Sequence, residues 1–103
     1  MEYISTRNTK RTFSFKDVFL KGLAPDGGLF IPVKIPSFSL QELEKLRHLS
    51  YEELATKIIF KFCNDVFSEE EIKNLVKDSY KNFRVNDVVA FKKIGQFNLL
   101  ELF

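Results

Sequence analysis

The segment at residues 24–29 carries the residue types in this sequence that are best suited to contacting a ligand. It reads Ala24-Pro25-Asp26-Gly27-Gly28-Leu29. Pro25 restricts one backbone angle, Asp26 can accept a hydrogen bond from the backbone two residues on, and two successive glycines allow another group to approach closely. Because Asp-Gly is a common turn dipeptide, two interpretations stay open. The segment is either a tight turn before a strand or a loop that faces an active site through Asp26, Gly27 and Gly28.

Arg7 is a second candidate, as a contact for phosphate. It follows Ser5 and Thr6, and a planar guanidinium can donate two parallel hydrogen bonds to a phosphate group. The alternative is an arginine that lies on the surface without a ligand. His48 and Cys63 are each the only residue of their type. Because no histidine pair, thiolate cluster or internal disulfide can form, the sequence predicts no metal site.

The composition excludes several classes of protein. With 45% hydrophobic and 29% charged residues, the chain of 103 residues is expected to fold as one domain. No apolar stretch approaches the roughly 20 residues of a membrane-spanning helix, and charged residues interrupt the N-terminus where a secretory signal needs an apolar run. We therefore expect a cytoplasmic protein. The 16 basic and 14 acidic residues alternate along the chain, which is typical of a solvated surface rather than of a nucleic-acid interface.

One repeated pattern, a serine followed three residues later by a carboxylate, predicts four helix starts. In such a capping box the serine oxygen accepts a hydrogen bond from the third helical N–H, while the acid accepts one from the N–H of the serine itself. The first pair uses an aspartate, which is shorter than the usual glutamate. The pairs are Ser14 with Asp17, Ser39 with Glu42, Ser50 with Glu53, and Ser68 with Glu71.

Apolar residues at steps of three and four follow each start and predict helices with one apolar face. The two longest patterns cover residues 51–63 and 69–82, and a further apolar position follows at Phe83. We expect these two helices to pack face to face as the core of the domain. Ile58 and Leu75 are expected to be buried in that core.

Short extended segments complete the predicted fold. Residues 3–6, 29–32, 88–94 and 97–103 are rich in β-branched and aromatic residues, and Gly95-Gln96 is typical of a two-residue hairpin turn between the last two. The sequence therefore predicts an α+β domain that is mostly helical. It should have about four helices and short strands, which include a C-terminal hairpin.

Three segments, in this order and at these distances, resemble the N-terminal domain of threonine synthase. The resemblance covers nearly the whole chain, although over residues 38–83 it is one of helix pattern rather than of residue identity. The three segments are Tyr3-Ile4-Ser5-Thr6-Arg7, Gly22-Leu23-Ala24-Pro25-Asp26-Gly27-Gly28-Leu29 and Leu99-Leu100-Glu101-Leu102-Phe103.

This resemblance implies the enzyme to which the chain contributes. Threonine synthase converts O-phosphohomoserine and water to threonine and phosphate, with pyridoxal phosphate as its cofactor. In that family the strand that ends here at Phe103 continues into a His-Gly-Pro-Thr segment that ends in Phe-Lys-Asp, whose lysine carries the cofactor. None of the twelve lysines of this sequence stands in that setting. We therefore expect residues 1–103 to be the N-terminal domain alone, with no catalytic or cofactor-binding residues and no activity by itself.

The expected partners follow from the same resemblance. The catalytic domains of the same parent chain would pack against this domain, and O-phosphohomoserine, whose phosphate Arg7 could contact, would be the substrate of the parent. Residues 97–103 form a nearly unbroken apolar strand, which in isolation is expected to expose an apolar edge and to cause self-association. Two alternatives remain. One is a threonine-synthase-like phospho-lyase, which releases phosphate without adding water productively, and the other is a stand-alone protein-interaction module derived from this domain.

Overall fold

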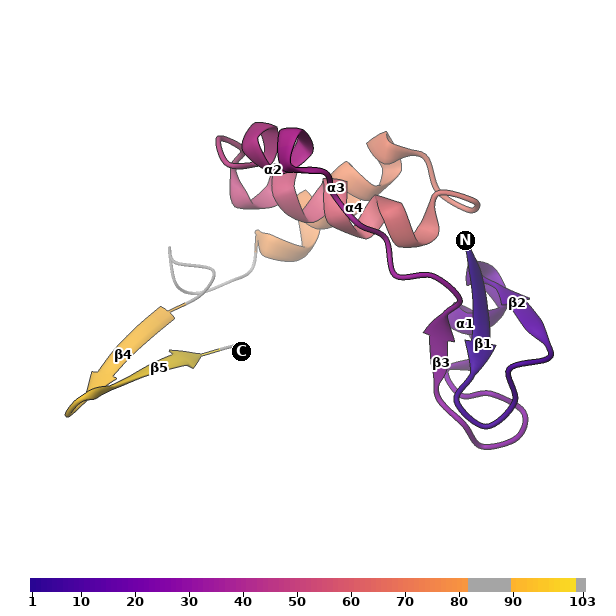
Figure 1. Cartoon of the computed structure of the whole chain (residues 1–103). Coiled ribbons are helices and arrows are strands. Elements are labelled where there is room, and N and C mark those ends of the chain that lie inside the picture. The colour runs from indigo at the N-terminus through magenta and orange to yellow at the C-terminus, as the bar shows by residue number, and fades with distance from the viewer. Residues whose placement is uncertain (82–89, 102–103) are drawn as a thin grey trace.

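The computed structural model describes residues 1–81 and 90–101 (Figure 1). In chain order its elements are β1 (Glu2–Ser5), β2 (Thr12–Ser14), α1 (Phe15–Lys21), β3 (Phe30–Pro32), α2 (Leu40–Leu46), α3 (Tyr51–Cys63), α4 (Glu69–Tyr80), β4 (Ala90–Ile94) and β5 (Phe97–Glu101). The predicted α+β class, with four helices in the described residues and a hairpin near the C-terminus, is confirmed. Of the described helices, none is long and apolar enough to cross a membrane.

All four of these helices begin at the predicted capping boxes. Each serine side chain accepts a hydrogen bond from the backbone N–H of the acid three residues later, at 3.1–3.3 Å. Each acid accepts a hydrogen bond from the backbone N–H of its serine, at 2.7–2.8 Å for the three glutamates. The corresponding distance for Asp17 is 3.4 Å, because its side chain is one methylene shorter. Local sequence is therefore sufficient to place the helix starts.

The N-terminal sheet has three antiparallel strands in the order β2-β1-β3. Tyr3 of β1 lies opposite Phe13 of β2, and Ser5 lies opposite Phe30 of β3. Tyr3, Ser5 and Phe13 are buried on one face of the sheet. Tyr3 and Ser5 share this face because they lie two residues apart in β1, and Phe13 shares it because it is the cross-strand partner of Tyr3. Strand β2 is not predicted from the sequence. It has three residues, the last of which is the N-cap of α1, and these are too few to show the alternation that identifies a strand.

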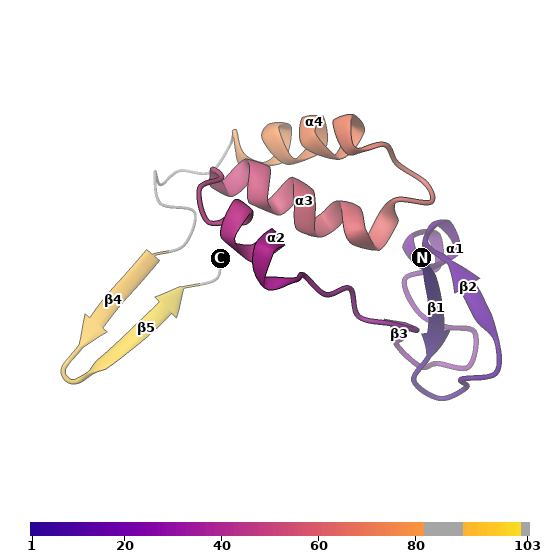
Figure 2. The same cartoon turned by 45° about the horizontal axis from the view of Figure 1, so that its top comes forward.

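Helices α3 and α4 pack side by side, as predicted (Figure 2). Cys63 of α3, with Ile72 and Val76 of α4, forms the buried cluster. The expectation that Ile58 and Leu75 are buried is wrong, since they are 40% and 53% exposed. Each helix carries apolar residues over a wider arc than its neighbour covers. Periodicity identifies that arc but not the part of it that becomes buried.

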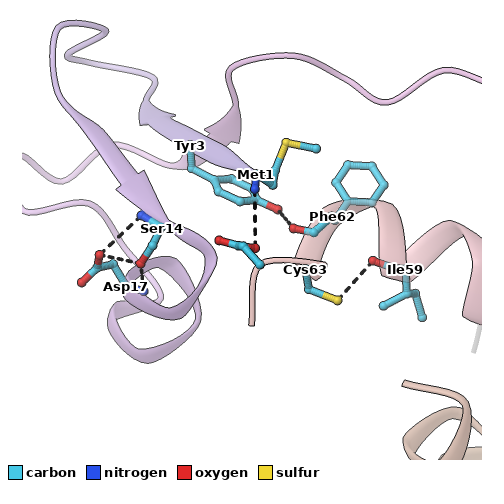
Figure 3. Close-up of polar contacts among 8 residues, drawn as sticks. Met1, Tyr3, Ser14, Asp17, Ile59, Phe62 and Cys63 are labelled. Atoms are coloured by element: carbon cyan, nitrogen blue, oxygen red, sulfur yellow. Dashed lines mark hydrogen bonds and ion pairs between the residues drawn. The ribbon is translucent and has the colours of Figure 1, made fainter. Parts of the chain in front are cut away.

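The sheet is attached to the helices through α3 and the residues just after it (Figure 3). The Tyr3 hydroxyl donates a hydrogen bond to the carbonyl oxygen of Phe62 at 2.6 Å, and the N-terminal ammonium of Met1 lies 3.5 Å from the Asp65 carboxylate. Burial raises the pKa of the Tyr3 phenol, and the negative charge of Asp65 raises it further. Tyr3 thus stays a neutral donor that anchors β1 to the end of α3.

The C-terminal hairpin, β4 with β5, stands apart from the other described elements in both views (Figures 1 and 2). Its two-residue turn begins at Gly95, whose φ of +60° agrees with the predicted glycine-first turn. Phe91 pairs with Leu100 on one face, and Ile94 pairs with Phe97 on the other. All four of these side chains are exposed. The radius of gyration of the chain is 16.8 Å, against about 13 Å for a compact domain of this length.

Some predicted positions lie outside the described residues. They are residue 82 at the end of the last predicted helix, Phe83 after it, residues 88–89 of the first predicted hairpin strand, and residues 102–103 of the second.

Candidate functional site

The structure brings the two candidate segments together at the ends of β1 and β3. Thr6 donates its backbone N–H to the carbonyl oxygen of Leu29 at 2.8 Å, and its hydroxyl oxygen accepts a hydrogen bond from the Leu29 N–H at 3.0 Å. Leu29 directly precedes β3, so the pairing of β1 with β3 carries residues 5–7 onto the loop of residues 24–29. Arg7 and Asp26 become neighbours for this reason.

Asp26 is held in place by two hydrogen bonds to one oxygen of its carboxylate. Its Oδ1 accepts a hydrogen bond from the Ser5 hydroxyl at 2.7 Å and another from the Gly28 backbone N–H at 2.9 Å. The second bond is the predicted one, to the backbone two residues on. These two bonds, that from Ser5 first, hold the pKa of the Asp26 carboxyl below its usual range, with a smaller contribution from the charge of Arg7. Asp26 is therefore a fixed, ionised acceptor at neutral pH.

Two hydrogen bonds hold Arg7, one to Ser5 of β1 and one to the loop. Its backbone N–H donates to the Ser5 hydroxyl oxygen at 3.1 Å, and its side-chain Nη1 donates to the backbone carbonyl oxygen of Asp26 at 3.1 Å. The side-chain bond uses one of the five N–H donors of the guanidinium. Arg7 is exposed, so the structure presents an anchored cation at the surface of the loop.

The two glycines make room for these contacts. A Cβ atom on Gly27 would lie 2.9 Å from Nη1 of Arg7, and one on Gly28 would lie 2.2 Å from the hydroxyl oxygen of Ser5. Gly27 also has a φ of +77°, which disfavours other residues. The close approach that the glycine pair permits is thus made by another segment of the same chain. Sequence reasoning assigned no role to Ser5, although its place two residues before Arg7 is visible in the sequence.

A small hollow borders the loop. Its volume is about 100 Å³, which gives room for a few water molecules or one small polar group. The Arg11 guanidinium lies 5.0 Å from the centre of the Phe13 ring, a cation–π arrangement at this edge of the sheet. The hollow is lined by Ser5, Asn8, Arg11, Phe13, Pro25 and Asp26.

The lysines of the described residues lack the surroundings that a Schiff-base lysine for pyridoxal phosphate needs. The described residues include all twelve lysines, of which eleven are exposed and Lys61 is half-buried. The Lys61 ammonium donates to the carbonyl oxygen of Ser37 at 2.8 Å and lies 3.6 Å from the centre of the Phe38 ring. A lysine that forms a Schiff base must lose its proton, which needs desolvation or a nearby cation. The side chains of Ser5 and Arg7 occupy the space beside Gly28 and Gly27, so the glycine pair leaves no open space there for a phosphate.

His48 and Cys63, each the only residue of its type in the sequence, lie on the surface and in the core, respectively. His48 is exposed in the turn after α2. Cys63 is buried, its Sγ donates to the carbonyl oxygen of Ile59 at 3.3 Å, and burial raises the pKa of its thiol. It packs as a small apolar residue. Among residues 1–81 and 90–101 no three metal-binding side chains gather in one place.

Sequence reasoning also missed an apolar groove of about 400 Å³ between α1 and the pair formed by α3 and α4. Phe15 of α1 meets Phe67 edge to face, with ring centres 6.2 Å apart. Leu75, at 53% exposure, lies in the open part of this groove. The groove exists only because a helix from the sheet unit lies beside the helical pair, a relationship that no local sequence pattern records.

Known sequences match this chain over its whole length. The family described as "Threonine synthase N terminus" matches residues 2–80. Threonine synthases of Pseudomonas aeruginosa and Schizosaccharomyces pombe are 36% and 38% identical to it, each over 100% of this chain and over 22% and 20% of their own lengths. Threonine synthase-like 2 of Homo sapiens is 31% identical over 99% of this chain and 22% of its own length. The chain therefore spans about a fifth of the length of these relatives.

Solved structures match as well. The crystal structure of PLP-bound threonine synthase from Brucella melitensis has a TM-score of 0.85 and 33% identity, over 100% of this chain and 22% of that one. Threonine synthase from Escherichia coli has a TM-score of 0.76 and 26% identity, over 87% and 20% of the two chains. Since the first match covers the whole chain, it includes the hairpin that stands apart from the helices. The family match over residues 2–80 joins with these alignments to show that the chain belongs to the threonine synthase N-terminal family.

Proposed function

We propose that residues 1–103 are the N-terminal domain of a pyridoxal-phosphate-dependent threonine synthase, which converts O-phosphohomoserine and water to threonine and phosphate. Catalysis and cofactor binding are carried out by the other domains of the parent chain, and this domain is inactive by itself. The observation that carries the proposal is that similarity covers all of this chain and only about a fifth of each relative. The surroundings of the twelve lysines support the same division of roles.

Within this domain, the loop of Asp26, Gly27 and Gly28 faces the active site of the parent, and Arg7 contacts the phosphate of the substrate. Two observations support the proposed role of Arg7. Its side chain is exposed, and its guanidinium is held through Nη1, by the hydrogen bond to the carbonyl oxygen of Asp26. A phosphate group pairs well with the remaining donors of a guanidinium. The Arg7 guanidinium contacts the backbone carbonyl oxygen of Asp26, whereas the Asp26 carboxylate accepts its hydrogen bonds from Ser5 and Gly28, so that carboxylate does not occupy the remaining N–H donors of Arg7.

The domain packs against its catalytic partners through apolar surface. An isolated two-stranded hairpin is marginally stable in water, and β4 and β5 carry exposed apolar residues on both faces. Both faces therefore need cover from the rest of the parent protein. The groove between α1, α3 and α4 is a second apolar surface that the partner domains can fill.

One substitution tests the role of the loop. In the full-length enzyme, Asp26→Asn should reduce turnover with little change in melting temperature, because the amide oxygen still accepts the bonds from Ser5 and Gly28 and only the charge is lost. Asp78→Asn is the matched control, since it makes the same change at an exposed carboxylate of α4, away from the loop. The Asp78 carboxylate lies 2.6 Å from the Lys81 ammonium. Unchanged turnover in Asp26→Asn would make Asp26 an ordinary turn residue.

A threonine-synthase-like phospho-lyase is the second candidate function, because a relative named threonine synthase-like 2 matches nearly all of this chain, as the threonine synthases do. The products separate the two enzymes. A threonine synthase releases threonine and phosphate in equal amounts from O-phosphohomoserine, whereas a phospho-lyase releases phosphate without threonine.

The stand-alone interaction module makes a different prediction, which the coding sequence after Phe103 tests. A stop codon supports the module, and a His-Gly-Pro-Thr segment followed by a lysine supports the enzyme.

A further inference from the structure

We propose that Ser5 is a positioning residue, which holds the Arg7 guanidinium where it can bind the phosphate of the substrate. This inference rests on the proposed phosphate contact of Arg7 and adds a residue that acts through it. Its basis is the arrangement in which one buried hydroxyl joins the backbone of Arg7 to the side chain of Asp26.

The Ser5 hydroxyl is used in both directions. Its oxygen accepts the Arg7 backbone N–H at 3.1 Å, and its proton is donated to Oδ1 of Asp26 at 2.7 Å. Ser5 is only 1% exposed, so water cannot replace the hydroxyl without a rearrangement of the loop. A hydroxyl can donate one bond and accept others, and here these capacities link two segments that lie 21 residues apart.

Arg7 depends on this link at both of its attachment points. Its backbone is held directly by Ser5, while its Nη1 is held by the carbonyl oxygen of Asp26, whose side chain Ser5 also holds. Gly27 closes the arrangement, because its α-carbon lies close enough to the guanidinium that a Cβ atom would reach Nη1 at 2.9 Å. Loss of the Ser5 hydroxyl therefore loosens the guanidinium without removing it.

The expected effect is on binding rather than on the chemical step. When only a fraction of molecules holds Arg7 in the binding position, the apparent dissociation constant rises by the inverse of that fraction. In a full-length threonine synthase that carries this sequence, Ser5→Ala should raise the KM for O-phosphohomoserine and the inhibition constant of inorganic phosphate. A rise of threefold to tenfold in both corresponds to about 0.7–1.4 kcal/mol. The kcat should stay close to that of the parent enzyme.

The matched control is Thr56→Ala. Thr56 is also buried, at 3% exposure, and its hydroxyl donates to the carbonyl oxygen of Glu52 at 2.7 Å, within α3. Its loss should lower the melting temperature without changing the inhibition constant of phosphate. If Ser5→Ala does not fold, Ser5→Cys is the second variant, since it keeps a side chain of similar shape with a weaker donor.

A double-mutant cycle with Arg7→Gln gives the decisive result. If Ser5 acts through Arg7, Ser5→Ala should cause no further rise in the inhibition constant of phosphate once Arg7 has been replaced. An undiminished effect of Ser5→Ala in the Arg7→Gln enzyme would overturn the inference. So would a Ser5 variant that binds phosphate normally while Arg7→Gln binds it weakly, and that result would leave the role of Arg7 intact. If Arg7→Gln itself binds phosphate normally, the proposed contact fails, and the role of Ser5 fails with it.

Discussion

Ser5 and Asp26, 21 residues apart in the sequence, are joined by a hydrogen bond of 2.7 Å from a fully buried hydroxyl to an ionised carboxylate. This bond connects the end of the first strand to the loop before the third strand. The loop that carries the glycine pair is therefore not an independent turn. Its conformation depends on the segment that ends in Arg7.

The first prediction concerns the space that Gly28 leaves for Ser5. Gly28→Ala should destabilise the domain by about 1–3 kcal/mol, the usual range for added volume in a packed site, because the new Cβ would lie 2.2 Å from the Ser5 hydroxyl oxygen. Its backbone angle is not in the positive range, so the conflict is steric. In a Ser5→Ala background the cost of Gly28→Ala should fall by about 0.5 kcal/mol or more. Urea unfolding of the four proteins measures this, and equal costs in both backgrounds would contradict it.

The second prediction compares two neighbours on α4. Ile72→Ala should cost about 2–5 kcal/mol, because it removes a buried aliphatic side chain, and Ile72 is 4% exposed. Leu75→Ala removes a side chain of the same size that is more than half exposed, so its cost should be less than half as large. The two variants serve as controls for each other in chemical unfolding. A similar loss of stability in both would mean that the buried face of α4 lies elsewhere.

The third prediction concerns the hairpin. The 103-residue chain by itself should form dimers or larger species, since the exposed apolar faces of β4 and β5 can pair with another copy. Leu100→Lys should weaken this association in sedimentation experiments. Asn98→Lys is the control, because it adds the same charge on the same face without removing apolar surface. A chain that stays monomeric at high concentration would show that the hairpin edge does not self-associate.

The fourth prediction is the response of the helix caps to acid. Hydrogen bonds from the backbone N–H and hydroxyl of each capping serine lower the pKa values of Glu42, Glu53 and Glu71. A carboxyl whose pKa is lower in the folded state stabilises the fold above its unfolded pKa, about 4.3 for glutamate. That contribution is lost as the pH falls through the lowered folded value.

Stability should therefore decrease below about pH 4.3, and Glu53→Gln should make the decrease shallower. Glutamine keeps an oxygen that can accept the serine N–H but cannot take up a proton. Urea unfolding between neutral and acidic pH measures the slope for both proteins. An unchanged slope in Glu53→Gln would show that this carboxylate does not contribute to the acid response.

Sequence alone was sufficient for features that depend on residues close together in the chain. The capping boxes required only a serine and an acid three positions apart, so all four described helix starts were predictable, including the one with the shorter Asp17. The hairpin turn at Gly95 was predictable for the same reason. The three segments that resemble threonine synthase also indicated the family, because residue identities at fixed spacings can be recognised in the sequence without knowledge of the fold.

Tertiary structure decided the features that depend on which surfaces meet. The apolar arc of α4 was readable from periodicity, but only the position of α3 buried Ile72 and left Leu75 open. Strand β2 is too short for a local signal and exists because β1 pairs with it. The sequence indicated Asp26 and the two glycines as a candidate loop. The space beside the glycines is occupied by the side chains of Ser5 and Arg7. Strand pairing sets that contact, and the pairing of β1 with β3 joins segments more than twenty residues apart, beyond the reach of any local pattern.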